Sequence, residues 1–101
     1  MSRQPTSSLV DLIELAKEPS SSKRRELLRN VTDIFMTQPD NVAGAEMELY
    51  DSVMSQLTSD METIVRAEIG VTIAGARNAP LGLLRKLAVD DIQVAEPILT
   101  R

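Results

Sequence analysis

The 101-residue sequence contains no cysteine and no histidine. Without cysteine, the chain can form neither a disulfide framework nor a thiolate metal site. Without histidine, it lacks the side chain that most often acts as general base and as transition-metal ligand. A catalytic or metal site in this chain would therefore have to rest on carboxylates.

Aromatic residues are almost as scarce, because the chain has no tryptophan, one tyrosine and one phenylalanine. Hydrophobic residues nevertheless make up 43% of the sequence, which is typical of a globular domain. The core must therefore consist of leucine, isoleucine, valine, methionine and alanine. That composition favours helix-on-helix packing over a β-sandwich.

Long apolar runs are also missing. No segment approaches the roughly 18 apolar residues that a membrane-spanning helix needs. Residues 1–8 lack the apolar stretch of a signal peptide. From these two features we predict a cytoplasmic protein.

The net charge of −4 is concentrated in the middle of the chain. Residues 38–68 hold one basic and seven acidic side chains, a local balance of −6. This distribution favours a basic partner surface over general nucleic-acid binding.

The periodicity of apolar residues predicts an all-α fold of about six short helices and no strand. The expected helices cover residues 8–18, 23–36, 45–57, 61–76, 80–88 and 92–99, with residues 1–7 as a flexible tail before a single domain over 8–101. A serine of the run 20–22 should cap the second helix. Asp60 should cap the fourth helix, and the pair Asp90-Asp91 should cap the sixth. Pro97 should kink the last helix or end it early.

Short connections make successive helices antiparallel neighbours, and a weak repeat suggests how they stack. Leu15, Leu57 and Leu87 each end a first helix, and a charged residue follows nine positions later in the second helix: Arg24, Arg66 and Glu96. Since a helix pair cannot bury its apolar face alone, such pairs share a core by stacking. Gly70 could allow a neighbouring helix to approach closely.

Two stretches carry a resemblance to known repeats. Residues 60–68, Asp-Met-Glu-Thr-Ile-Val-Arg-Ala-Glu, resemble the opening of the second helix of HEAT-type repeats. Residues 79–99 combine an Ala-Pro helix start with the run Leu-Ala-x-Asp-x-Ile-x-Val-Ala-x-Pro, and resemble an uncharacterised HEAT-like bacterial family found mostly in alphaproteobacteria. The resemblance implies a HEAT-like α-solenoid over roughly residues 9–99 and implies no chemistry. It also implies that this chain is the N-terminal part of a longer protein; the alternative is a short protein that dimerises.

Arg66 is expected to form a structural ion pair with Asp60 or with Asp90, as acids and arginines of successive repeats do in HEAT-like stacks. The carboxylate pairs Glu14/Glu18, Asp60/Glu62 and Asp90/Asp91 could in principle serve a paired-acid enzyme or a hard cation. Cap positions and polar helix faces explain these acids more simply. We therefore predict no catalytic residue, cofactor or metal.

By elimination, the sequence favours a non-catalytic protein-protein interaction or scaffold module that binds another protein or a peptide. The residues proposed to contact that partner are Glu46, Glu48 and Asp51 in the acidic middle, with Arg25 and Arg29 on the second helix. Arg29 could instead pair with Asp33, one turn away. An alternative function is nucleic-acid binding through the Lys23–Arg29 cluster, and a second is a carboxylate-based enzyme or metal site.

Overall fold

The computed structural model describes residues 20–38 and 44–101, and this part of the chain folds into helices without any strand. The five helices are α2 (Ser21–Met36), α3 (Gly44–Ser59), α4 (Thr63–Ala74), α5 (Leu81–Ala88) and α6 (Ile92–Leu99). The prediction of an all-α fold is confirmed for this part of the chain. The helix expected over residues 8–18 and most of the loop expected after residue 37 lie outside it.

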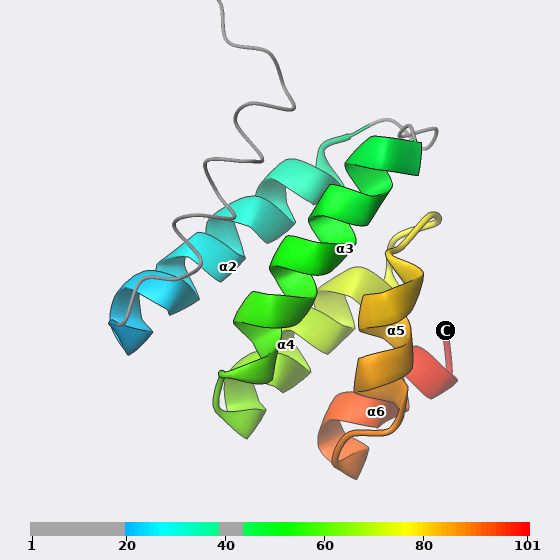
Figure 1. Ribbon diagram of the computed structural model, residues 1–101. Coiled ribbons are helices and arrows are strands. Elements are labelled where there is room, and N and C mark those ends of the chain that lie inside the picture. The colour runs from blue at the N-terminus through cyan, green and yellow to red at the C-terminus, as the bar shows by residue number, and fades with distance from the viewer. Residues whose placement is uncertain (1–19, 39–43) are drawn as a thin grey trace, which may run out of the picture.

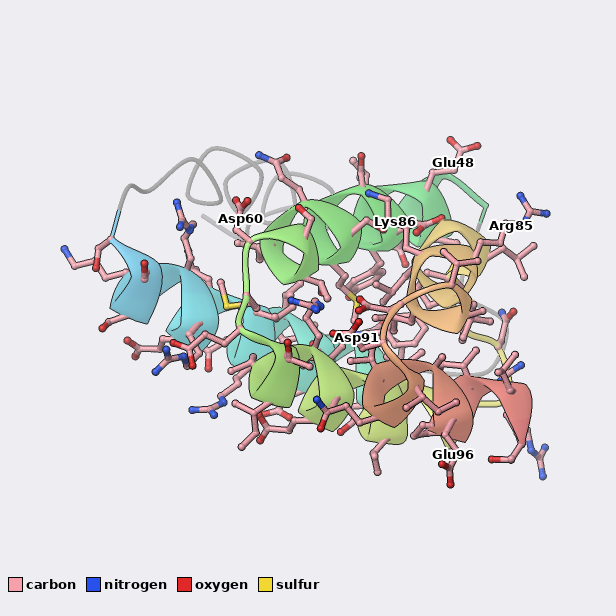
Figure 2. The ribbon with its side chains drawn as sticks, turned by 90° about the horizontal axis from the view of Figure 1, so that it is seen from below. Glu48, Asp60, Arg85, Lys86, Asp91 and Glu96 are labelled. Carbon is pink, nitrogen blue, oxygen red and sulfur yellow. The ribbon has the colours of Figure 1, made fainter. Side chains whose placement is uncertain are left out.

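The helices lie in two layers (Figures 1 and 2). Packing joins α3 to α5 in one layer and α4 to α6 in the other, where α2 also borders α4. The connected pairs α2 and α3, and α5 and α6, pack across the layers. Successive helices therefore alternate between the layers, and α5 and α6 form the end of the arrangement farthest from α2 (Figure 1).

One continuous core lies between the layers. Every described helix contributes fully buried aliphatic side chains, among them Leu28, Met54, Ile73, Leu83 and Val94. Phe35 and Tyr50 add an edge-to-face ring contact with centroids 5.2 Å apart. The low aromatic content is thus compatible with a well-packed helical core.

The capping of the helices differs in part from the sequence prediction. Ser20 caps α2, accepting a hydrogen bond from the Lys23 N–H at 3.4 Å, as expected of that serine run. At α4 the cap is Glu62 rather than Asp60, because the chain first makes a turn that buries Met61. At α6 the cap residue is Asp91, and its side chain makes no capping hydrogen bond.

Two residues of low helix propensity are accommodated differently. A Cβ atom on Gly70 would lie 3.1 Å from the carbonyl oxygen of Val94, so this glycine lets α6 approach α4 closely, as predicted. Pro97 does not end α6, which continues to Leu99. Because proline has no N–H, the Gln93 carbonyl, four residues earlier, receives no α-helical hydrogen bond from residue 97; Gln93 is an exposed residue.

Candidate functional site: helix grooves and the charges around them

Arg66 of α4 forms the most highly connected polar contact in the described structure. Its Nε–H donates to Asp90 Oδ2 at 2.8 Å, and Nη2 donates to Asp90 Oδ1 at 3.0 Å, a bidentate pair. Nη1 donates to the carbonyl of Met61 at 2.6 Å. The guanidinium thereby ties the α3–α4 turn to the α5–α6 turn. Of the two acids expected to face Arg66, the structure places Asp90 there and leaves Asp60 exposed in the turn before α4.

The ion pair with Arg66 gives the Asp90 carboxylate a structural role. The hydrogen bonds from Arg66 lower the pKa of the Asp90 carboxyl, and the backbone N–H of Asp91 adds to that effect. The same hydrogen bonds raise the pKa of Arg66. A general acid would need a raised carboxyl pKa, which is the opposite shift. Of the predicted capping pair Asp90-Asp91, Asp91 holds the N-cap position of α6, and Asp90 Oδ1 accepts a hydrogen bond from the Asp91 N–H at 2.7 Å.

Asp51 of α3 caps a helix that is distant in sequence. Its Oδ2 accepts from the Gly82 N–H at 2.9 Å and its Oδ1 from the Leu83 N–H at 2.8 Å, both in the first turn of α5. The residue at the N-cap position of α5 is Pro80, which has no side-chain acceptor. The carboxylate therefore satisfies N–H groups that α5 cannot satisfy itself. Both carboxylate oxygens of the predicted partner contact Asp51 therefore accept hydrogen bonds within the fold.

The remaining predicted acids lie at the start of α3. Glu48 is exposed and points outward, as Figure 2 shows. Glu46 is half-buried beside Tyr50; burial raises the pKa of the Tyr50 hydroxyl, and the charge of Glu46 raises it further. Only Glu48 therefore stays fully available at the surface.

Arg25 and Arg29 lie on α2 opposite two glutamates of the α4 segment. The Arg25 Nη2–Glu62 Oε1 distance is 3.5 Å, and the Arg29 Nη2–Glu68 Oε2 distance is 3.2 Å. Asp33, the predicted partner of Arg29, is not its partner, because the glutamate of the neighbouring helix is within reach. All four side chains border a shallow groove of about 330 Å³, the α2–α4 groove, with Ile64 and Val65 as its apolar lining.

An apolar row lies along the outer side of α4. Ile64 and Val71 are seven residues apart, so they share one face of the helix, and they are 74% and 62% exposed. Val65, Ile69 and Ile73 occupy the opposite face and are buried in the core. Glu68 lies between the two exposed residues and carries the ion pair to α2. We call Ile64 and Val71, together with the α2–α4 groove, the α4 face.

A second groove, between α3 and α5, is polar. It is lined by Glu48, Asp51, Ser52, Ser55, Gln56, Ser59, Gly82 and Lys86, and has a volume of about 570 Å³. Ser55 donates to Asp51 Oδ1 at 3.1 Å, and Ser59 donates to the Gln56 carbonyl at 2.9 Å. Both hydroxyls thus donate to acceptors of the same helix, and the Asp51 carboxylate that Ser55 contacts is itself held by the N–H groups of α5.

Deeper in the same region, the hydroxyl of Thr58 is buried without a hydrogen-bond partner. Leaving such a group unsatisfied costs about 1–3 kcal/mol. The atom is almost completely enclosed and so is not open to a ligand. Its effect is on stability, and sequence reasoning gave no indication of it.

In residues 20–38 and 44–101, no three acidic side chains gather closely enough to hold a metal ion. No helix in the same ranges has the length and apolar character required to cross a membrane. Glu14 and Glu18, the first predicted carboxylate pair, lie outside the described residues. No family model, curated protein or solved structure matches the chain.

Proposed function

We propose that this chain is a non-catalytic protein-interaction module built as a HEAT-like stack of helix pairs, and that a segment of another protein binds on the α4 face. The observation that carries the proposal is the exposure of Ile64 and Val71 beside a groove with charged walls. Large apolar side chains grouped on a surface and rimmed by polar residues are typical of interaction sites.

The energetics favour a partner with apolar side chains at helical or extended spacing. Complete burial of a valine or isoleucine side chain is worth about 1.5–3 kcal/mol. Covering both Ile64 and Val71 would therefore supply several kcal/mol before the cost of association. Micromolar affinity needs about 8 kcal/mol net of the cost of association, so apolar side chains of the partner that become buried on the same face must supply the rest.

The charges of the groove add a second requirement. The two arginines and two glutamates that line it form two ion pairs across α2 and α4, so the groove has no net charge. A partner that carries both acidic and basic residues around its apolar side chains can form new ion pairs with these arginines and glutamates in place of the existing ones. A uniformly charged polymer would have to displace one member of each pair.

The same pairing argues against the nucleic-acid alternative. A phosphate would have to compete with Glu62 for Arg25 and with Glu68 for Arg29. Counterion release, which supplies most of the affinity for duplex DNA, requires free basic side chains. The acidic net charge of the chain opposes binding further.

The alternation of the helices between two layers supports the HEAT-like part of the proposal. In stacked helix pairs, each layer is made of every second helix, and adjacent pairs share a core. The Arg66–Asp90 pair joins the turns of two successive pairs, as the resemblance implies. A stack of this type leaves one outer face of each layer free for binding.

The proposal can be tested by peptide selection without knowledge of the natural partner. A library of displayed peptides would be selected on the wild-type chain, with counter-selection on Ile64→Glu/Val71→Glu. The matched control is Val89→Glu, because Val89 is 86% exposed but lies in the α5–α6 turn. We expect enriched peptides with apolar residues at regular spacing that bind the wild type and V89E alike and bind the double variant at least about tenfold more weakly.

Two results would contradict the proposal. One is a selection that enriches no sequence, or only sequences that bind the double variant equally well. The other is binding of a mixed-sequence duplex at moderate salt that Arg25→Ala and Arg29→Ala abolish. The second result would establish the nucleic-acid alternative instead.

A further inference from the structure

The α5–α6 pair ends the described stack with an apolar edge that is separate from the α4 face. On α5, Gly82 and Lys86 face α3, since both line the groove between these helices. Leu81, with Leu84 and Ala88 at i+3 and i+7, occupies the side turned away from α3. Leu81 is 63% exposed.

Helix α6 continues this edge. It approaches α4 at Val94, where Gly70 allows close contact. Ile92 and Leu99 are seven residues apart on another side of the helix and are 70% and 64% exposed. Helical spacing places Leu81, Ile92 and Leu99 along one apolar edge of the α5–α6 pair, which we call the open edge; Leu81, like the other two, is largely exposed.

Opposite charges flank the open edge. Helix α5 contributes Arg85 and α6 contributes Glu96. The other two charges of this pair point elsewhere, because Lys86 lines the α3–α5 groove and Asp91 Oδ2 lies 3.8 Å from Arg66 Nη2. Arg85 and Glu96 each lie near the middle of their helices, and both are exposed. Figure 2 shows Arg85 in the upper layer and Glu96 on the lower side of the molecule, in the same end region.

We propose that the open edge binds the open edge of a second copy of this chain, about a two-fold axis that runs along the helix pair. This symmetry sets α5 of each copy against α6 of the other. The basic helix then lies against the acidic helix twice, with Arg85 beside Glu96 of the second copy, and Leu81 meets Leu99. The alternative two-fold axis, across the helices, would set Arg85 against Arg85 and Glu96 against Glu96.

The size of the edge predicts a weak dimer. Each helix has eight residues and is therefore about 12 Å long. Two such helices offer less than the roughly 800 Å² per partner that a standard stable interface buries. We therefore expect association in the micromolar range, with a monomer at high dilution.

The test is a charge-reversal set measured by light scattering or sedimentation across a concentration series. Arg85→Glu alone, or Glu96→Arg alone, replaces two attractive contacts by two repulsive ones and should weaken the dimer at least about tenfold. The double variant R85E/E96R recreates opposite charges across the axis, so we expect association within about threefold of the wild type. Leu99→Glu should leave a monomer at every concentration.

Lys23→Glu and Glu48→Arg are the matched controls, since they make the same charge changes on exposed residues of α2 and α3. Both should dimerise like the wild type. Helicity measured by circular dichroism identifies any variant that fails to fold. If one of the single variants fails to fold, the association of the double variant R85E/E96R decides the test. A wild-type chain that stays monomeric up to millimolar concentration would overturn the proposal. So would a double variant that associates no better than either single variant.

Discussion

Replacing Asp51 by alanine should destabilise the fold more than the loss of an ordinary surface carboxylate would. The carboxylate accepts from two N–H groups in the first turn of α5 and from the Ser55 hydroxyl. Loss of an N-cap acceptor costs about 1 kcal/mol, and hydrogen bonds to a charged acceptor are worth more than neutral ones. Because Leu83 is buried, water cannot fully replace the lost acceptor. We therefore expect a loss of about 2 kcal/mol in the free energy of unfolding.

Urea denaturation followed by circular dichroism measures this loss directly. For a chain of this size, about 2 kcal/mol corresponds to a fall in Tm of about 8–16 °C. Asp60→Ala is the matched control, because Asp60 is exposed in a turn and caps no helix in this structure; it should change stability by less than about 0.5 kcal/mol.

A double-mutant cycle with Gly82 tests the geometry of the same contact. A Cβ atom on Gly82 would lie 2.6 Å from Asp51 Oδ2, so Gly82→Ala should displace the carboxylate. The cost of Gly82→Ala should then be smaller in the Asp51→Ala background than in the wild type. Equal losses of stability for Asp51→Ala and Asp60→Ala, or additive effects of the substitutions at 51 and 82, would contradict the capping role of Asp51.

Three further substitutions test other parts of the structure. Thr58→Val removes a buried hydroxyl without a partner and should raise the free energy of unfolding by about 1 kcal/mol in urea denaturation; a loss of stability would contradict this. Gly70→Ala should lower Tm, because its Cβ would press on the Val94 carbonyl, whereas a higher Tm would mean that α6 can move away. Arg66 keeps the pKa of Asp90 below its unfolded value, so the pair stabilises the fold above about pH 4 and this stabilisation is lost as pH falls through the lowered pKa. The difference in stability between wild type and Asp90→Asn should therefore shrink on acidification below about pH 4, and a difference that stays constant as the pH falls would contradict the assignment.

The helices were predictable because their residues carry the signal locally. The apolar spacing of α2 to α6 gave each helix within about two residues at either end. Ser20 and Gly70 behaved as their types suggest, one as a cap and the other as a point of close approach. These features depend on neighbours within one or two turns of the chain.

Contacts between distant segments were harder to predict. Asp51 caps a helix 31 residues further on, and nothing near it in sequence indicates this; the only available sign was Pro80, which leaves the start of α5 without an acceptor of its own. Arg29 has a suitable acid on its own helix but pairs with Glu68 of α4, because packing brings the two helices together. Asp60 has a good capping side chain, yet burial of Met61 moves the start of α4 past it.

The same distinction applies to the candidate site. Arg25 and Arg29 were predicted as partner contacts from their type, and they do border a groove. The exposure of Ile64 and Val71 could not be predicted, since an apolar residue on an amphipathic helix is normally assigned to the core. Only the packing of the layers distinguishes the inner side of α4 from its outer side.

The most direct test of the proposed function is an NMR titration of the isotopically labelled chain with the tightest peptide from the selection. We predict chemical-shift changes concentrated at Ile64, Glu68 and Val71 and at Arg25 and Arg29 across the groove, with little change along the polar side of α3. Changes concentrated in the α3–α5 groove, or spread evenly over the chain, would contradict the assignment of the α4 face as the binding surface.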